Sequence, residues 1–203
     1  MESGPRDVDV CALLPHAAVR VFVMGDRAIR HEAATAEDIY QMRAITRQAI
    51  EAGAFGFSTS RTVSHKTLKG DYTPTLRAHE DELTGIAMGM ADAGAGFLEI
   101  VSDWNAPDPE TEFAMLRRVI EQSGRTAVFS LTQRHDRTTF WRDLLRLAGE
   151  AVDDGLSIRP VVAPRPIGIL LGLQGSQNPF SGTPTYKKLA ALHVAESAAA
   201  RSD

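Results

Sequence analysis

The sequence contains little of what marks a secreted or membrane-bound protein. Its 203 residues include a single cysteine, Cys11, so no disulfide can form within the chain. A chain without disulfides is typical of a reducing compartment, and we expect a cytoplasmic protein. The apolar runs are too short to cross a bilayer, and residues 1–7 lack the apolar core of a secretory signal. Cys11 lies in an apolar stretch, which predicts a buried packing residue rather than a nucleophile.

The sequence also lacks a block of basic residues. The formal net charge is -4, and the charged residues are dispersed, so we expect no binding to nucleic acid or to an anionic membrane surface. Hydrophobic residues make up 43% of the chain, as in ordinary globular proteins, and the length is sufficient for one sizeable core. No linker-like segment interrupts the sequence, and residues 1–203 are therefore predicted to form one domain or part of one.

Short apolar runs alternate with stretches of helical periodicity along most of the chain. Helices are predicted where a polar N-cap such as Thr35 precedes apolar residues at helical spacing and a glycine such as Gly53 follows. For residues 19–24 the pattern allows either a strand or the start of a helix. The predicted strands are residues 8–14, 55–58, 97–102, 126–131 and 158–163. The predicted helices are residues 36–52, 78–93, 107–122, 138–152 and 186–200.

This alternation predicts a parallel sheet covered by helices, that is, an α/β fold. Two architectures fit the pattern. One is an open, doubly wound sheet, which is complete with five strands. The other is a TIM-like (β/α)8 barrel, of which the chain would hold about five of the eight βα units. The number of units does not choose between them, but in both architectures functional groups lie at the carboxyl ends of the strands.

Four stretches of the sequence are similar to a known enzyme family. Residues 51–59, EAGAFGFST, closely match the EAGALGFST signature of amidohydrolase family 3, the N-acyl-D-amino-acid deacylase type. Pro-His at residues 15–16, followed by Val-Arg at 19–20, resembles the family's strand that ends in Gly-His before a Leu-Arg pair. Residues 23–27 resemble the family's helix entry, and residues 75–83 resemble the TEEL helix start after the signature's loop.

The resemblance implies a fold and a reaction. The fold would be a partial TIM-like barrel of the metal-dependent hydrolase type, with residues 1–203 as a single, incomplete barrel segment that supplies roughly the third to seventh strands. The reaction would be hydrolysis of C–N bonds other than peptide bonds, with N-acyl-D-amino acids as the substrate class. Because such a segment lacks the closing strands and most catalytic groups, we expect it to be inactive alone.

The resemblance also implies zinc, which activates water and polarises the scissile carbonyl. The family's ligands include a His-x-His pair on the first strand and histidines on the fifth and sixth strands. This sequence contains no His-x-His. By spacing, the fifth and sixth strands correspond to residues 99–102 and 130–131, which contain no histidine. We therefore assign no metal ligand in this chain.

Four residues are candidates for substrate binding. His16 matches the Gly-His position of the family, and Ser58 and Thr59 end its signature. Arg165 lies between two prolines, on a stiff segment from which a guanidinium could bind a carboxylate. Each has a structural alternative: packing or a loop position for His16, hydrogen bonds at the strand end for Ser58 and Thr59, and the solvated surface for Arg165.

Asp103 and His135 are the candidate catalytic residues. Both follow predicted strands, on the side where barrel enzymes keep their sites, and both can transfer protons. For His135 the alternative is a solvated cluster with its charged neighbours Arg134 and Asp136.

Two further hypotheses stay open. The chain could be a non-catalytic module derived from the same barrel, self-contained or paired with another copy that covers its sheet edges. It could also be a metal-independent hydrolase in which Asp103 and His135 perform the acid–base chemistry. Under the enzyme hypotheses the partner is a small-molecule amide, and under all of them a homo-oligomer is compatible with the sequence.

Overall fold

The computed structural model describes residues 4, 7–67, 69–104, 108–134, 137–166, 168, 171–172, 178–189 and 192. The chain divides into two compact units. The first comprises Met1–His65 and Tyr72–Val162, and the second comprises Lys66–Asp71 and Ala163–Asp203. The first unit contains the whole sheet, and the second contains the short helix α7 (Pro184–Leu189).

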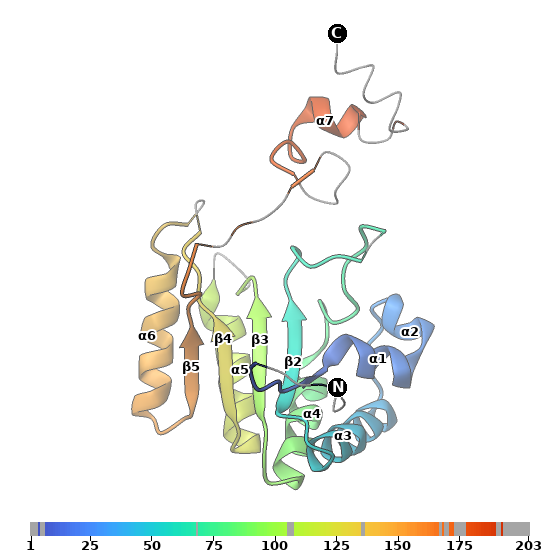
Figure 1. Ribbon diagram of the computed structural model, residues 1–203, viewed down its shortest axis with the longest axis vertical. Coiled ribbons are helices and arrows are strands. Elements are labelled where there is room, and N and C mark those ends of the chain that lie inside the picture. Colours follow the sequence, from blue (N-terminus) through green and yellow to red (C-terminus); the bar gives the residue numbers. More distant parts are fainter. Residues whose placement is uncertain are drawn as a thin grey trace. The chain divides into compact units, whose positions relative to one another are not determined.

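The first unit is built on one sheet of five parallel strands (Figure 1). The strands are β1 (Leu13–Pro15), β2 (Gly56–Arg61), β3 (Phe97–Ser102), β4 (Thr126–Ser130) and β5 (Ile158–Val161). The helices of this unit are α1 (His16–Met24), α2 (Asp26–Ile29), α3 (Ala36–Glu51), α4 (Glu80–Asp92), α5 (Pro109–Ser123) and α6 (Phe140–Asp153).

The strand order is β1-β2-β3-β4-β5, so each strand lies beside the one that precedes it in the chain. A doubly wound sheet reverses this order at a switch point, and no reversal occurs here. Because right-handed crossovers that advance in one direction place every helix on the same face, α3, α4, α5 and α6 pack side by side. This is the arrangement of a barrel wall, and it resolves the choice that the number of units left open.

The helices begin and end at residues with clear capping chemistry. Thr35 caps α3 in a reciprocal box with Asp38, as its polar side chain predicts. Asp108 caps α5, and Gly124 ends that helix in the left-handed conformation. Residues 19–24, for which both a strand and a helix were compatible with the pattern, are helical and belong to α1.

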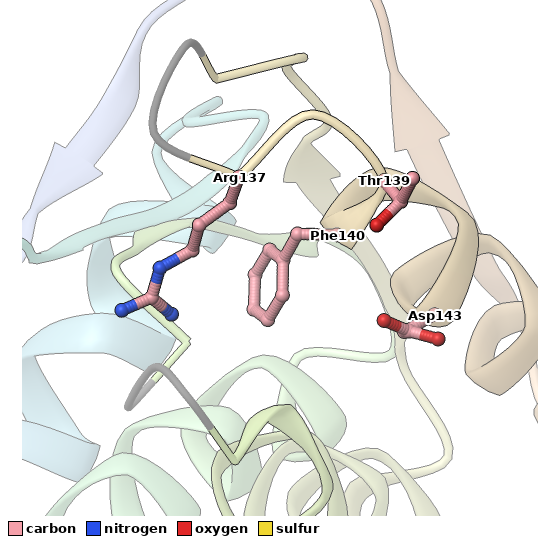
Figure 2. A pocket seen from close by; sticks show the side chains of 4 residues that line it. All are labelled: Arg137, Thr139, Phe140 and Asp143. Carbon is pink, nitrogen blue, oxygen red and sulfur yellow. The ribbon is translucent and has the colours of Figure 1, made fainter.

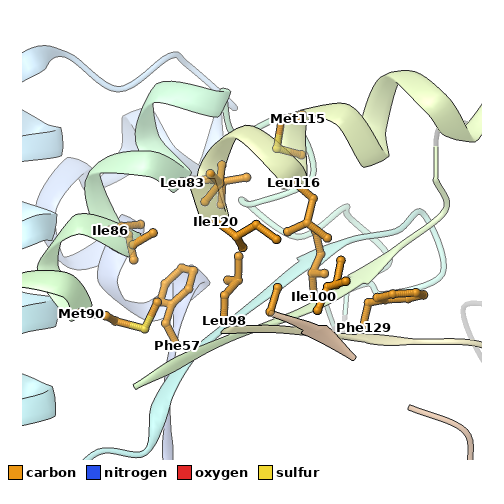
Figure 3. Close-up of a cluster of buried hydrophobic side chains, with 14 of the residues drawn as sticks. Phe57, Leu83, Ile86, Met90, Leu98, Ile100, Met115, Leu116, Ile120 and Phe129 are labelled. Carbon is orange, nitrogen blue, oxygen red and sulfur yellow. The ribbon is translucent and has the colours of Figure 1, made fainter. Parts of the chain in front are cut away.

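The core lies between the sheet and the helices (Figure 3). Leu98 and Ile100 of β3 are buried, whereas Phe97, Glu99 and Val101, which alternate with them, are partly exposed. One face of the sheet is therefore packed and the other is the face that lines the interior in a closed barrel. The core contacts in Figure 3 join Phe57, Leu98, Ile100 and Phe129 of the strands to Leu83, Ile86, Met90, Leu116 and Ile120 of α4 and α5.

The prediction that Cys11 is buried is wrong. The sulfhydryl is exposed, because β1 begins only at Leu13 and residue 11 precedes the sheet. Within the described part of the chain, no helix is both long and apolar enough to span a membrane. The helix expected over residues 186–200 corresponds to α7, and most of residues 190–200 lie outside the described residues.

Candidate functional site

Polar side chains gather where β2, β3 and β4 end. The strands are parallel, so their carboxyl ends meet at one edge of the sheet. The last register pair of β2 and β3 is Arg61 with Ser102, and Asp103 continues the ladder by donating its N–H to the carbonyl of Arg61 at 3.2 Å. The loops that follow β2 and β3 are thereby joined at their first residues.

Asp103 connects three strand ends. Its Oδ1 accepts a hydrogen bond from Thr62 Oγ1 at 2.7 Å, and its Oδ2 accepts one from the Val63 N–H at 2.7 Å. Arg134, which follows β4, places a guanidinium nitrogen 3.7 Å from Oδ1. The side chain of Asp103 is 28% exposed. Its carboxylate holds the turn after β2, and the predicted catalytic role of Asp103 stays a prediction.

The same loop carries a serine–histidine pair. The Ser60 Oγ atom, at the end of β2, lies 2.5 Å from Nδ1 of His65. Ser60 is half-buried and His65 is exposed. The Ser60 carbonyl accepts a hydrogen bond from Thr75 Oγ1 at 2.6 Å, which ties the far end of the loop to the strand.

Arg61 points to the opposite side of β2 from Ser60. It forms a two-pronged ion pair with Glu112 of α5, with nitrogen–oxygen distances of 2.5 and 3.2 Å, and donates to the Ala78 carbonyl at 2.5 Å. Ser102 donates to the same Glu112 carboxylate at 3.1 Å. These contacts fix the ends of β2 and β3 against the helix layer.

A buried polar network lies behind β2, on the helix side. His16 Nδ1 lies 2.8 Å from Thr59 Oγ1, and His16 Nε2 lies 2.7 Å from Glu82 Oε1. Arg20 donates to the other oxygen of Glu82 and to the Glu32 carbonyl. His16, Arg20 and Glu82 are each 1% exposed. The network joins α1, β2 and α4.

This geometry is compatible with a neutral His16. A neutral imidazole that donates from Nε2 to Glu82 and accepts from Thr59 at Nδ1 satisfies both ring nitrogens. Burial lowers the pKa of His16, although the Glu82 carboxylate acts in the opposite direction. Burial acts to raise the pKa of Glu82, but hydrogen bonds from His16 and Arg20 outweigh it and that pKa lies below its usual value. The charge of Glu82 is balanced by Arg20.

The structure separates the predicted substrate-binding residues. His16 and Thr59 lie together in the buried network, on the packed face of the sheet. Ser58 is half-buried on the opposite face, where it is in register with Glu99. Arg165 is exposed and belongs to the second unit. Substrate contact by these residues stays a prediction, and His135 lies outside the described residues.

A hollow of about 310 Å³ lies at the start of α6 (Figure 2). It is lined by Arg137, Thr139, Phe140 and Asp143. The Arg137 guanidinium lies over the Phe140 ring, 5.5 Å from its centroid, so a cation–π contact orders one wall. The hollow is on the loop that follows β4, and therefore at the carboxyl end of that strand.

The residues of this chain do not fit the zinc site that the resemblance implies. Among the described residues, no group of three or more histidine, cysteine, aspartate or glutamate side chains could hold a metal ion. Residues 99–102 and 130–131, which correspond to the family's fifth and sixth strands, contribute one glutamate and no histidine. We therefore derive no step of a reaction through a metal bound to this chain.

The uninterrupted parallel strand order and the polar strand ends define the class: the chain forms part of a TIM-like α/β barrel. The sequence model of the amidohydrolase family matches residues 3–201. The chain belongs to this family. No curated protein sequence matches the chain significantly.

Solved structures have the same fold over most of the chain. A D-aminoacylase studied for its binuclear metal centre has 19% identity and a TM-score of 0.65, covering 80% of this chain and 32% of its own. An N-acyl-D-glutamate deacylase from Bordetella bronchiseptica, complexed with zinc and a phosphonate inhibitor, has 24% identity and a TM-score of 0.62, covering 78% of this chain and 31% of its own. The chain thus spans about a third of the length of these structures.

Sequence reasoning missed three residues that organise the site: Ser60, His65 and Glu82. His65 follows Ser60 by five residues in the sequence, a spacing that a tight turn can close. Glu82 lies in the stretch that resembles the family's TEEL helix start, and that resemblance was the available signal for a buried acid at this position.

Proposed function

We propose that the protein is an amidohydrolase that hydrolyses C–N bonds other than peptide bonds, with N-acyl-D-amino acids as the substrate class. The family match over residues 3–201 carries this proposal. The solved structures of similar fold support the substrate class, because a D-aminoacylase and an N-acyl-D-glutamate deacylase are among them.

The substrate would bind at the carboxyl ends of the strands. The groups there suit an N-acylated amino acid, because Ser60 and His65 offer hydrogen-bonding groups and Arg134 offers a cation near the strand ends. We further propose that residues 1–203 act as one incomplete barrel segment, which binds substrate but does not turn it over alone.

The cellular setting and partners belong to the same proposal. The protein would act in the cytoplasm on a small-molecule amide, without nucleic acid or membrane as partner. Copies of the chain would associate through the sheet edges, since β1 and β5 each have one strand neighbour in the described sheet.

Binding and turnover of matched enantiomers would test the proposal. The purified chain is titrated with N-acetyl-D-glutamate and N-acetyl-D-methionine by calorimetry, with the L-enantiomers as controls. Release of free amino acid is then measured from the same mixtures, with and without added zinc. We expect selective binding of D-compounds without turnover.

Each other outcome has a defined meaning. Turnover by the chain alone would support the reaction and overturn the inactivity of the segment. A folded chain that neither binds nor hydrolyses any of these amides would overturn the proposal. That result would favour the second candidate, a non-catalytic module, for which the lack of a three-ligand metal cluster among the described residues is the supporting observation.

A further inference from the structure

We propose that the hollow at the start of α6 binds a free α-amino acid in its zwitterionic form. The hollow has a volume of about 310 Å³ and is lined by Arg137, Thr139, Phe140 and Asp143. Its size suits a small molecule, since ligand pockets typically measure about 300–1,000 Å³. The inference rests on the proposed function for its natural ligand, which would be the amino acid that deacylation releases.

The hollow presents one charge of each sign. The guanidinium of Arg137 lies on one side of the Phe140 ring, and the carboxylate of Asp143 lies on the other side with the hydroxyl of Thr139 (Figure 2). A guanidinium binds a carboxylate through two parallel hydrogen bonds, and a carboxylate accepts hydrogen bonds from an ammonium group. A free amino acid carries both partners. A simple anion would be repelled by Asp143, and a simple cation would be repelled by Arg137.

Phe140 supplies apolar surface between the two charges. Its ring is half-buried, and the Arg137 guanidinium lies over it, 5.5 Å from the ring centroid. This cation–π contact orders the guanidinium before a ligand arrives. Binding sites for small molecules combine such apolar surface with a few polar groups that fix the orientation of the ligand. We therefore expect amino acids with an apolar side chain to bind best.

The lining residues are held in place by the start of α6. The Phe140 N–H donates to the Arg137 carbonyl at 3.3 Å, which ties the loop to the helix. Phe140 and Asp143 are three residues apart in α6 and lie on the same side of its first turn. The next residue, Leu144, is buried in the core and anchors this turn. The aromatic wall and the carboxylate are therefore positioned by a packed helix.

The ammonium group distinguishes the ligand of the hollow from the substrate proposed above. Acylation converts this group into a neutral amide. An N-acylated amino acid thus keeps the carboxylate that Arg137 would bind but lacks the cation that Asp143 would bind. The hollow should prefer the released amino acid, whereas the substrate would bind near Ser60 and His65 at the end of β2. The chain would then hold substrate and product at separate places.

Three probes with the same side chain test the two charges separately. The full chain is titrated at pH 7 with D-methionine, with N-acetyl-D-methionine and with 3-(methylthio)propylamine, which lacks the carboxylate. The indole N–H of Trp141, which donates to the Thr138 carbonyl at 3.1 Å beside Phe140, gives a local nuclear magnetic resonance signal that Trp141→Phe assigns. We expect D-methionine to shift this signal and to bind at least about tenfold more tightly than either singly charged probe, the usual contribution of a hydrogen bond to a charged group.

Two variants connect each charge of the ligand to one residue. Asp143→Asn should abolish the preference for D-methionine over N-acetyl-D-methionine, and Arg137→Gln should abolish the preference over 3-(methylthio)propylamine. Arg137→Lys keeps the charge and should retain that preference. Arg142→Gln is the matched control, because Arg142 lies over the Trp141 ring, 5.2 Å from its centroid, and does not line the hollow. Circular dichroism shows whether each variant is folded, and the comparison of the three probes in the wild type needs no variant.

Three results would overturn the site: no binding of D-methionine, equal dissociation constants for the three probes, or preferences that persist in Asp143→Asn and Arg137→Gln. The outcomes also separate this inference from the proposed function. D-Methionine binding in a chain that binds no N-acyl-D-amino acid would leave the site standing and remove the proposed substrate. Binding of N-acyl-D-amino acids without any binding of D-methionine would do the reverse.

Discussion

The imidazole of His16 and the carboxylate of Glu82, 66 residues apart in the sequence, meet at 2.7 Å with each side chain 1% exposed. A buried acid of this kind is stable only while its partners remain, because water cannot replace them. The contact joins α1, which precedes the family signature at residues 51–59, to α4, which follows it, and the same imidazole contacts Thr59 of the signature.

Removing the charge of Glu82 should destabilise the protein strongly. Glu82→Gln leaves the buried guanidinium of Arg20 without its counter-ion, and breaking a buried pair in this way costs about 3–5 kcal/mol. Glu80→Gln is the matched control, because its ion pair with Arg118 is partly exposed to solvent and is worth about 0–1 kcal/mol. Urea unfolding measures both, and equal effects of the two substitutions would contradict the prediction.

The stability of the protein should decrease as the pH falls below 6.5, because of His16. Its pKa is lowered in the folded state, so the unfolded chain takes up the proton first as the pH drops below 6.5. With respect to His16, the free energy of unfolding therefore has its full value above pH 6.5 and declines below that pH. The lowered pKa of Glu82 adds a second loss below its usual value of 4.5, as that carboxylate is protonated.

Unfolding by urea at pH 5 to 8, followed by tryptophan fluorescence, measures the His16 effect. His16→Gln should flatten the decline that begins at pH 6.5, whereas His79→Gln, an exposed control, should retain it. A decline of unchanged size in His16→Gln would mean that another group is responsible.

Replacing each of two helix glycines with alanine should change the stability of the protein in opposite directions. A Cβ on Gly89 would lie 2.4 Å from the carbonyl oxygen of Arg43, where α4 approaches α3, and overpacking of this kind costs about 1–3 kcal/mol. Gly149 of α6 is exposed and a Cβ there meets nothing within 4 Å, so Gly149→Ala should stabilise by about 0.5–1 kcal/mol. Thermal unfolding of the two variants measures both effects. Stabilisation by Gly89→Ala would contradict the close packing of α4 against α3.

Copies of the chain should associate as concentration rises. The described sheet ends in β1 and β5, and Val161 on β5 is 51% exposed. Val161→Lys should weaken association, because lysine on an edge strand opposes pairing, whereas Val152→Lys on the exposed side of α6 should not. Light scattering measures the mass, and a wild-type monomer at every concentration would contradict the prediction.

Local signals were sufficient for much of the fold. The run 97–102 was predicted at the bounds that β3 has, because an apolar strand there is enclosed by glycines and polar residues. The cap at Thr35 was equally local, and the helix predicted over residues 107–122 ends one residue before α5 does. Residues 19–24 were ambiguous because valine suits both states, and contacts of α1 with α2, α3 and β2 accompany the helix.

Relationships between distant residues could not be predicted. Strand order depends on how units assemble, so the barrel was indistinguishable from the doubly wound sheet until the order was known. His16 and Glu82 lie in stretches that resembled the family separately, and nothing in either stretch indicates their contact. Ser60 and His65 are close in sequence, but the turn that joins them depends on Asp103, 40 or more residues away.

The unbroken strand order has a consequence for how the protein unfolds. Each βα unit pairs only with its neighbours in the chain within the described sheet. The sheet therefore behaves as a linear array in which each unit is stabilised by the units beside it. Opening of β5 with α6 leaves the pairings of β1, β2 and β3 intact, whereas loss of β3 divides the array in two. Amide protons of β3 would therefore exchange most slowly, and protection would decrease toward both ends of the sheet.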